Sequence, residues 1–399
     1  FNLLQMKPED RHAFLTETFS DDKGFGFSYI RISIGCSDFS LSEYTCCDKK
    51  GIENFALQSE EKEYILPILK EILDINPSIK IIAAPWTCPT WMKVKSLTDL
   101  TPFESWTNGQ LNPAYYQDYA TYFVKWVQAF NAEGIDIYAV TPQNEPLNRG
   151  NSASLYMSWE EQRDFVKTAL GPKFKTAGLA TKIYAYDHNY DYSDIETEKN
   201  YPGKMYEDPA ASQYLAGAAY HNYGGNREEL LNMHKAYPEK ELLFTETSIG
   251  TWNSGRDLSK RLLEDMKEVA LGTINNWCKG VIVWNLMLDN DRAPNREGGC
   301  QTCYGAVDIS NSDYKTIIRN SHYYIIAHLS SVVKPGALRI GADSNIMYSA
   351  FENPDGTYAF VLMNNNEKTK RITFSDGKRH FAYDVPGKSV TSYRWAKSE

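Results

Sequence analysis

Two glutamates in this sequence each follow a short apolar run that is typical of a buried β-strand. Glu145 lies in Thr-Pro-Gln-Asn-Glu-Pro after residues 136–141, and Glu246 lies in Leu-Phe-Thr-Glu-Thr-Ser after residues 242–245. Cleavage of a glycosidic bond needs such a pair, because one carboxyl group protonates the leaving oxygen while the other attacks the anomeric carbon. A separation of about 5 Å between the two groups gives the retaining reaction. We therefore predict Glu145 as the general acid/base and Glu246 as the nucleophile.

A lone glutamate after a strand is more often a salt-bridge partner than a catalyst. Here the Asn-Glu-Pro context of Glu145, and the aromatic residues that border both strands, favour the catalytic interpretation. Repulsion between the two carboxylates, together with partial burial, is expected to raise the pKa of Glu145 and to leave Glu246 ionised. Asn144 is expected to hydrogen-bond the sugar 2-hydroxyl, a contact that strengthens in the transition state.

The other expected strands also end in polar and aromatic side chains. The residues that we expect to line the substrate site beside Asn144 are Arg31, Asp38, Trp86, His221, Tyr223 and Trp284. Aromatic rings suit stacking on sugar rings, and the polar groups suit hydroxyls. Structural alternatives are packing for the tryptophans, an ion pair for Arg31 and capping of a carbonyl for His221. For Asp187 and His188, a site role and a structural role are equally open.

Short apolar runs alternate with amphipathic stretches through most of the chain. Strands are expected at 29–34, 80–86, 136–141, 182–186, 217–221, 242–245 and 281–284, and helices at 60–75, 115–133, 159–170 and 257–273. This alternation predicts a parallel sheet with crossover helices, and the site residues end its strands. Because no glycine-rich phosphate loop follows any strand, a (β/α)8 TIM barrel is favoured over an open doubly wound sheet. The eighth strand is expected ahead of Phe1.

The pattern changes after about residue 333. Short strands are expected at 346–351, 358–363, 371–374 and 390–395, separated by turn sequences such as Asn-Pro-Asp-Gly, with no helix between them. Runs of strands joined by turns indicate an antiparallel arrangement. We therefore predict a catalytic barrel at residues 1–332 and a small antiparallel β-sandwich at residues 333–399.

Composition and charge restrict the partners. A formal net charge of −9 argues against nucleic acid, for which a basic stripe would be expected. No apolar run approaches the length of a transmembrane helix, so stable membrane insertion is not expected. Cys300-Gln-Thr-Cys303 lacks a second pair or nearby histidine ligands, so a short loop disulfide is favoured over free thiols and over a zinc site. The oligomeric state is left open.

These residues resemble glycoside hydrolase family 30 over nearly the whole chain. The segments that carry the resemblance are YIRISIGCSDFS from residue 29, APWTCPTWMK from 84, AVTPQNEP from 139, FTETS from 244 and VWNL from 283. The resemblance implies a barrel with a β-sandwich, and the catalytic roles given above for the two glutamates. It places Arg31 behind the nucleophile and assigns glucose binding to Asp38, Trp86, Asn144 and Trp284. It also implies a barrel strand upstream of Phe1 and no metal or organic cofactor.

The loop at residues 299–303 resembles the β-1,6-glucanases of that family more than its glucosylceramidases. The resemblance therefore implies a β-glucan or β-glucoside substrate and favours an endo-β-1,6-glucanase. A glucosylceramidase or another exo-β-glucosidase is the alternative, and a non-catalytic carbohydrate-binding protein that kept the barrel is a further one. Family membership also implies a secreted, periplasmic or cell-surface protein, although no signal peptide is visible in the sequence.

Overall fold

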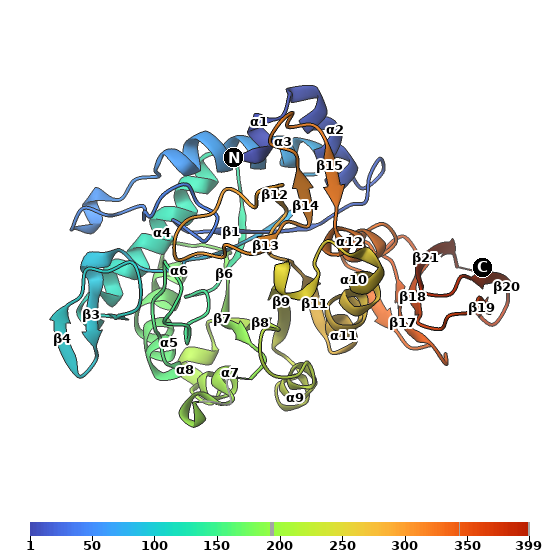
Figure 1. Cartoon of the computed structure of the whole chain (residues 1–399). Helices are drawn as coiled ribbons and strands as arrows, with labels where there is room; N and C mark the ends of the chain where they lie inside the picture. The colour runs from blue at the N-terminus through green and yellow to red at the C-terminus, as the bar shows by residue number, and fades with distance from the viewer. Residues whose placement is uncertain (192–194, 343, 398–399) are drawn as a thin grey trace.

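The computed structural model describes residues 1–191, 195–342 and 344–397. Its centre is a seven-stranded parallel sheet, around which the helices are arranged (Figure 1). In spatial and chain order the strands are β1 (Tyr29–Ser33), β2 (Lys80–Ala84), β6 (Ile137–Val140), β7 (Lys182–Asn189), β8 (Leu215–His221), β9 (Glu241–Glu246) and β11 (Cys278–Val281). Each strand pairs in parallel with the next. The carboxyl ends of all these strands therefore meet at one mouth, as predicted.

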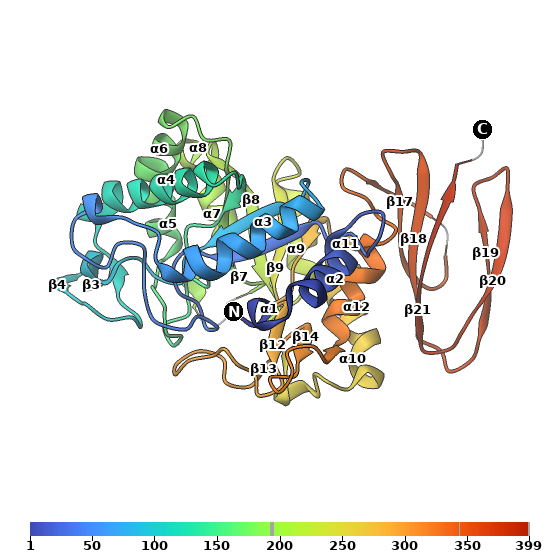
Figure 2. The same ribbon diagram turned by 90° about the horizontal axis from the view of Figure 1, so that it is seen from above.

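Helices cover the outside of this sheet (Figure 2). They are α1 (Asn2–Gln5), α2 (Pro8–Phe19), α3 (Leu66–Ile75), α4 (Tyr116–Ala132), α5 (Trp159–Phe165), α6 (Gly171–Thr176), α7 (Tyr201–Tyr206), α8 (Pro209–Ser212), α9 (Glu228–Ala236), α10 (Leu258–Asp265), α11 (Leu271–Asn275) and α12 (Ser321–Ser330). The long helix α4 buries an aromatic stripe that includes Tyr119, Phe123 and Trp126. Its helical spacing predicts this packing role. None of the described helices is both long and apolar enough to cross a membrane.

Three predicted helices are not continuous α-helix. The helix predicted at 60–75 begins with the π-helical segment Glu61–Ile65, which leads into α3. The helix predicted at 159–170 begins at a capping box of Ser158 and Glu161, but a π-helical segment, Val166–Leu170, follows α5 and leads into α6. The helix predicted at 257–273 likewise passes through the π-helical segment Met266–Ala270 between α10 and α11. The spacing of hydrophobic residues predicts a helix, but it cannot distinguish a π-helical turn from an α-helical turn, because both keep one face of the helix on the core.

The seventh strand differs from its prediction. The structure places β11 at Cys278–Val281, earlier than the predicted 281–284. Beyond Val281 the chain still runs beside β9, because the N–H groups of Ile282 and Trp284 donate to backbone carbonyls of that strand and of the loop after it. The pairing is irregular there, so the apolar run continues past the regular strand.

The two edges of the sheet are β1 and β11, which no described strand joins. A cavity of about 290 Å³ lies between them and is lined mainly by apolar side chains, including Tyr29, Ile30 and Ile282. The eighth strand expected ahead of Phe1 stays a prediction.

Small sheets that the sequence did not predict surround the mouth of the barrel. One contains β3 (Lys93–Ser96), β4 (Asp99–Pro102) and β5 (Gln110–Leu111), a second β10 (Ile249–Gly250) and β13 (Cys303–Tyr304), and a third β12 (Met287–Asp289), β14 (Val307–Ile309) and β15 (Ile317–Arg319). Their strands are too short to show a hydrophobic period. They matter because β10 and β13 lie in loops that border the site.

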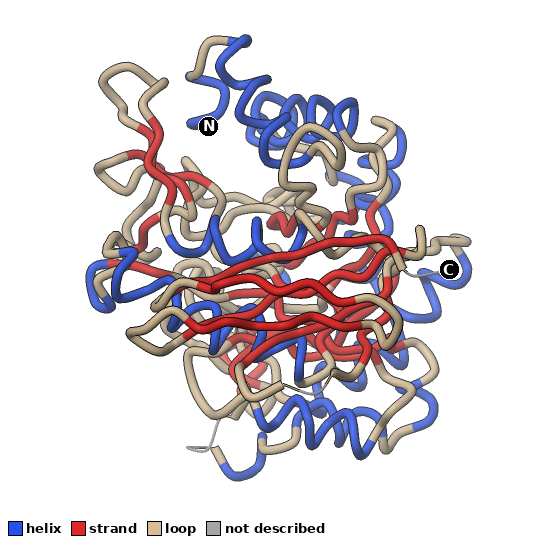
Figure 3. The backbone as a smooth tube through the Cα atoms, turned by 90° about the vertical axis from the view of Figure 1, so that its right-hand side faces the viewer, coloured by secondary structure: helices blue, strands red, loops and turns tan. Residues whose placement is uncertain are grey.

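The C-terminal part is an antiparallel β-sandwich, as predicted (Figure 3). One sheet contains β16 (Leu338–Ile340), β17 (Met347–Glu352), β18 (Thr357–Asn364) and β21 (Ser389–Ala396), and the other contains β19 (Lys370–Ser375) and β20 (His380–Val385). Aromatic side chains such as Phe360, Phe374 and Trp395 pack together. Strands β16 and β20 were not predicted, because most of their residues are exposed and give no buried face.

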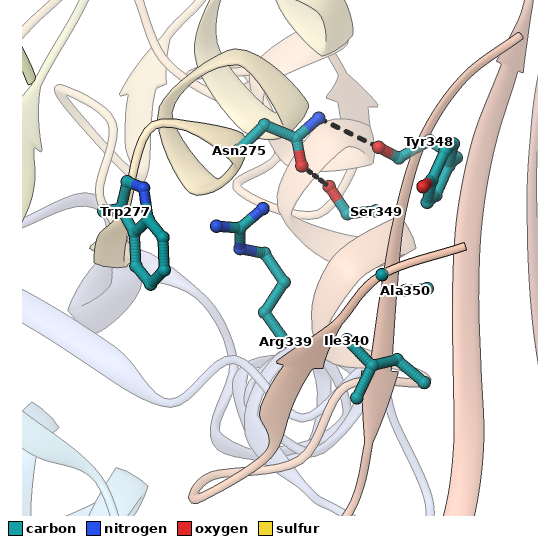
Figure 4. A pocket seen from close by; sticks show the side chains of 8 residues that line it. Asn275, Trp277, Arg339, Ile340, Tyr348, Ser349 and Ala350 are labelled. Atoms are coloured by element: carbon teal, nitrogen blue, oxygen red, sulfur yellow. Dashed lines mark hydrogen bonds between the residues drawn. The ribbon is translucent and has the colours of Figure 1, made fainter. Parts of the chain in front are cut away.

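Direct polar contacts join the sandwich to the barrel (Figure 4). Asn275 at the end of α11 donates to the carbonyl oxygen of Tyr348 and accepts from the Ser349 hydroxyl. Beside them the Arg339 guanidinium lies over the Trp277 ring, 4.6 Å from its centroid, at the edge of a cavity of about 430 Å³. The connection from α12 to β16 contains the boundary predicted between residues 332 and 333.

Candidate active site

The two glutamates predicted to be catalytic lie together at the barrel mouth. Glu145 lies in the loop after β6, Glu246 is the last residue of β9, and both side chains are buried. Three atoms lie within 4.8 Å of one another: one carboxylate oxygen of Glu145, one carboxylate oxygen of Glu246 and one ring nitrogen of His221. Carboxyl groups in retaining glycosidases are about 5–5.5 Å apart, against about 6.5–9.5 Å in inverting ones. The separation therefore fits the retaining class.

Unusual backbone conformations aim the side chains in this part of the mouth. Glu145 and Asp187 both have positive φ values, 46° and 70°, which are uncommon for residues with a Cβ atom. The Glu145 N–H donates to the Asp187 carbonyl oxygen at 3.0 Å, which joins the loop after β6 to strand β7. Such conformations cluster at functional sites, where the surrounding structure holds them in place.

Arg31 on β1 connects three of the strand ends. Its Nη1 donates to Oε2 of Glu246 at 2.7 Å. Its Nη2 donates to Oδ1 of Asn144 at 2.6 Å and to Oδ2 of Asp187 at 2.8 Å. The guanidinium is buried and has a fixed fork of donors, so it sets the positions of its partners. Arg31 thus contacts Glu246, next to which the sequence analysis placed it.

Asp187, whose role the sequence left open, lies at the centre of this network. Its Oδ2 also accepts from the Thr141 hydroxyl at 2.7 Å, and its Oδ1 accepts from the Thr245 hydroxyl at 2.6 Å. The same Oδ1 lies 3.0 Å from Nε2 of His221. Burial acts to raise the pKa of Asp187, but Arg31 and His221 outweigh it and hold this pKa well below its usual range. Asp187 is therefore a fixed negative charge.

The pKa shift expected for Glu145 is corrected by the structure. Burial acts to raise the pKa of Glu145, but the hydrogen bond with His221 and the nearby His188 and Asn148 outweigh it, so this pKa falls to about 2. For Glu246, burial dominates and raises the pKa, although His221 and Arg31 oppose the shift. The expected rise in the pKa of Glu145 is therefore wrong, because the sequence-based argument treated the carboxylates as an isolated pair.

His221 explains the difference. Its Nδ1 lies 3.3 Å from Oε1 of Glu145 and 3.8 Å from Oε1 of Glu246. Burial acts to lower the pKa of His221, but Glu246, Asp187 and Glu145 together raise it to about 9. The proton that an isolated Glu145 would hold therefore resides on the neighbouring imidazole.

Three of the predicted sugar-binding residues, Asp38, Trp86 and Trp284, form a second wall of the site beside Arg31. The rings of Trp86 and Trp284 are stacked with centroids 5.0 Å apart, and Trp86 Nε1 donates to Oδ1 of Asp38 at 3.1 Å. Burial above all, with the charge of Glu246, raises the pKa of Asp38 to about 6. The Arg31 guanidinium carbon lies 5.0 Å from the Trp86 ring centroid, which links this wall to the carboxylates.

Further polar residues form hydrogen bonds with the carboxylate oxygens of the two glutamates. The hydroxyl of Tyr223, whose side chain is partly exposed, donates to Oε1 of Glu246 at 3.1 Å and lies 2.7 Å from the Ser248 hydroxyl. Asn148 donates to Oε2 of Glu145 at 2.8 Å. Sequence reasoning missed Asn148 and Ser248, although Ser248 is the last residue of the quoted segment around Glu246 and Asn148 lies two residues after Pro146. The structure joins all of the predicted site residues in one contact network: Arg31, Asp38, Trp86, Asn144, Glu145, His221, Tyr223, Glu246 and Trp284.

The cluster of Glu145, His221 and Glu246 is also compact enough to ligate a metal ion. Each of these groups already has a polar partner within the protein. A cation between the carboxylates would take the space that an anomeric carbon needs during attack by one of them. The expectation that no cofactor is required stays a prediction.

A parallel barrel that presents two facing carboxylates beside stacked indole rings defines the chain as a glycoside hydrolase. The sequence matches the model of the glycosyl hydrolase family 30 TIM-barrel domain over residues 1–333, and that of the family 30 beta sandwich domain over residues 336–393. The chain therefore belongs to glycoside hydrolase family 30. The predicted family, the predicted fold of barrel and sandwich, and the predicted enzyme class are confirmed.

Individual relatives agree with this family. The chain is 31% identical over 401 residues to endo-1,6-beta-D-glucanase BGN16.3 of Trichoderma harzianum, covering 93% of this chain and 76% of that protein. It is 28% identical over 394 residues to putative glucosylceramidase 4 of Caenorhabditis elegans, covering 91% and 72%. The solved structure of the endo-beta1,6-glucanase BT3312 is similar with 87% identity and a TM-score of 0.98, covering 99% of this chain and 89% of that one.

Proposed function

We propose that this protein is a retaining endo-β-1,6-glucanase that uses Glu246 as nucleophile and Glu145 as general acid/base. The observation that carries the proposal is the pair of carboxylate oxygens within 4.8 Å of each other at the barrel mouth. Arg31 holds Oε2 of Glu246, which leaves Oε1, on the side of Glu145 and His221, as the attacking oxygen. The proton for the leaving oxygen comes from the Glu145–His221 pair.

The second half of the reaction uses the same groups in reverse. Once the leaving group has departed, Glu145 accepts a proton from a water molecule whose oxygen attacks the anomeric carbon. The ester bond to Glu246 breaks, and the sugar is released with unchanged anomeric configuration. The developing positive charge on the sugar is stabilised by the carboxylate of Glu246. The partly exposed Trp284, which stacks on the buried Trp86, offers an aromatic surface to the ring. We expect Asn144, whose side-chain oxygen accepts a hydrogen bond from Arg31, to contact the sugar 2-hydroxyl.

The choice of substrate is supported by the 87% identity to a protein named as an endo-β-1,6-glucanase. The relatives named as glucosylceramidases are 25–29% identical and support the alternative, an enzyme that releases glucose from glucosylceramide. Both alternatives use the same carboxylates and differ in what surrounds the leaving group. Because a glucan polymer does not cross a membrane, we also propose that the protein acts outside the cytoplasm, in a secreted, periplasmic or surface-attached form.

Digestion of a linear β-1,6-glucan and of glucosylceramide micelles, side by side, tests this proposal. A ladder of short gluco-oligosaccharides from the glucan, with ceramide release slower by orders of magnitude, is the expected outcome. Glucose alone from the glucan would indicate an exo-acting enzyme, and preferential release of ceramide would support the glucosylceramidase. Glu246→Gln protein, which is expected to give no products, is the control for contaminating activity.

A further inference from the structure

The Cys300-Gln-Thr-Cys303 segment forms a disulfide, which agrees with the interpretation favoured from the sequence. The other cysteines, which are buried, are free thiols. This small ring lies in the loop before β13, at the wall of the site that contains the stacked tryptophans. The glycosidase mechanism does not use it, so its position needs a separate explanation.

One end of the disulfide ring holds Asp38. The backbone N–H of Cys300 donates to Oδ2 of Asp38 at 2.9 Å, while Oδ1 of the same carboxylate accepts from the Trp86 indole at 3.1 Å. Both carboxylate oxygens therefore have a fixed donor. The loop also packs closely on Asp38 at the preceding residue, Gly299, because a Cβ atom added there would lie 2.8 Å from the Cα and carbonyl oxygen of Asp38.

The other end of the ring holds the loop after the nucleophile. Cys303 pairs with Gly250, and Tyr304 pairs with Ile249, in the short antiparallel ladder of β10 and β13. Ile249 follows Glu246 closely in the chain, and Ser248 between them contacts the Tyr223 hydroxyl. The ring thus connects the tryptophan wall to the loop that follows β9.

We propose that the Cys300–Cys303 disulfide is a positioning element that fixes the Cys300 N–H on Asp38 and thereby sets the affinity of the site for its glucosyl unit. The inference rests on the proposed function, because it assigns Asp38 and Trp86 to the glucosyl subsite. Reduction by a dithiol transfers two electrons and two protons to the bond, which gives two thiols and the cyclic disulfide of the reductant. The loop then loses the covalent link that holds its N–H in place.

A purely stabilising role explains the location less well. Cross-links gain stability mainly by closing long loops, and this one closes a very short loop. The electrostatics favour the positioning role, because burial, Glu246 and Glu145 raise the pKa of Asp38 to about 6, while the Cys300 N–H and Arg296 oppose that rise. Loss of the N–H removes one of the two opposing influences and weakens the ionised form.

Kinetics of the double variant Cys300→Ser/Cys303→Ser test the proposal. Loss of one hydrogen bond to a charged group predicts a KM for an aryl β-glucoside raised about tenfold, with kcat changed less than about twofold. The dissociation constant of a gluco-configured iminosugar, measured by calorimetry, is expected to rise by the same factor. Wild-type protein treated with dithiothreitol should show the same change, and the double variant should not respond to dithiothreitol.

A double-mutant cycle with Asp38→Asn separates positioning from general destabilisation. If the disulfide acts through Asp38, its removal from the Asp38→Asn protein should have little further effect on iminosugar binding, whereas independent effects would add. Cys278→Ser, which alters a buried free thiol elsewhere, is the matched control for cysteine replacement. If the double variant does not fold, as shown by near-ultraviolet circular dichroism, the dithiothreitol titration of folded wild-type protein replaces it.

Unchanged KM and iminosugar affinity after loss of the disulfide would overturn the proposal, as would additive effects in the cycle. This failure is distinguishable from failure of the proposed function. Wild-type protein with the disulfide intact that hydrolyses neither β-glucan nor aryl β-glucoside would contradict the proposed function. Iminosugar affinity, measured with and without the disulfide, would still show whether the disulfide affects binding.

Discussion

The Nδ1 atom of His221 lies 3.3 Å from Oε1 of Glu145, and Nε2 of the same ring lies 3.0 Å from Oδ1 of Asp187. The imidazole thus connects the proposed acid/base to a carboxylate whose negative charge is fixed by Arg31. A proton that moves between the ring and Glu145 leaves the net charge of the pair unchanged. The proton is therefore available to the leaving oxygen even though the pKa of Glu145 lies near 2.

The variant His221→Gln is expected to shift the alkaline limb of the pH–activity profile. In the wild-type protein the Glu145–His221 pair keeps its proton until the pH rises through about 9. Without the imidazole the proton resides on Glu145 alone, so it is lost at lower pH. We expect the alkaline limb of kcat/KM to move down by at least about one pH unit, since a buried carboxyl rarely matches a pKa of about 9. An unchanged limb would show that His221 does not share the catalytic proton.

Removal of the Arg31 charge is expected to destabilise the fold as well as the site. Arg31→Met leaves Asp187 and Glu246 buried without their cation, which predicts a loss of about 3–5 kcal/mol in the free energy of unfolding. Arg371→Met is the matched control, because Arg371 pairs with Asp384 on the exposed surface, where such a pair contributes about 0–1 kcal/mol. Urea unfolding of both variants measures the difference, and similar losses would contradict the role given to Arg31.

Much of the site could be predicted because the ends of parallel strands converge. Once the strands are placed, the residues at their ends must meet at one mouth, which is why Glu145 and Glu246 could be chosen from the sequence. The part played by Asp187 could not, since it depends on a positive φ value and on two threonine hydroxyls from neighbouring strands.

Charge states and short loop strands were the weakest part of the sequence analysis. The lowered pKa of Glu145 depends on its distance to the His221 ring, and the raised pKa of Glu246 depends on its burial; no spacing in the sequence reveals either. The paired strands β10 and β13 are too short to have a periodic pattern, and long-range contacts rather than local preference determine them. The fold class was more robust, because it rests on the alternation of many strands and helices.

Tyr223→Phe is expected to lower activity without a change in stability. The phenol donates to Oε1 of Glu246, the proposed attacking oxygen, so its loss removes one donor that orients the nucleophile. We expect kcat/KM to fall about tenfold, equivalent to one hydrogen bond to a charged acceptor. Tyr383→Phe, on the exposed face of β20, is the control and should behave as wild type. A melting temperature lowered in Tyr223→Phe alone would point to a structural role instead.

Glu145→Ala should separate substrates by their leaving groups. A dinitrophenyl β-glucoside needs no proton to leave, whereas an alkyl β-glucoside does, so general acid catalysis of about 10²–10⁴-fold is lost only for the latter. Steady-state rates for both substrates measure the effect. Added azide, which replaces the water that Glu145 activates, should give a β-glucosyl azide. Equal losses for the two substrates would remove Glu145 from the acid role.

The account depends most on Glu246 as the nucleophile. Incubation with an activated 2-deoxy-2-fluoro β-glucoside, followed by proteolysis and mass spectrometry, locates the trapped sugar directly. The account predicts a covalent 2-fluoroglucosyl ester on the peptide that contains Glu246, and its loss in Glu246→Gln. A label on any other residue would contradict it. So would an active wild-type protein that hydrolyses its substrate but forms no covalent adduct with the fluorinated sugar.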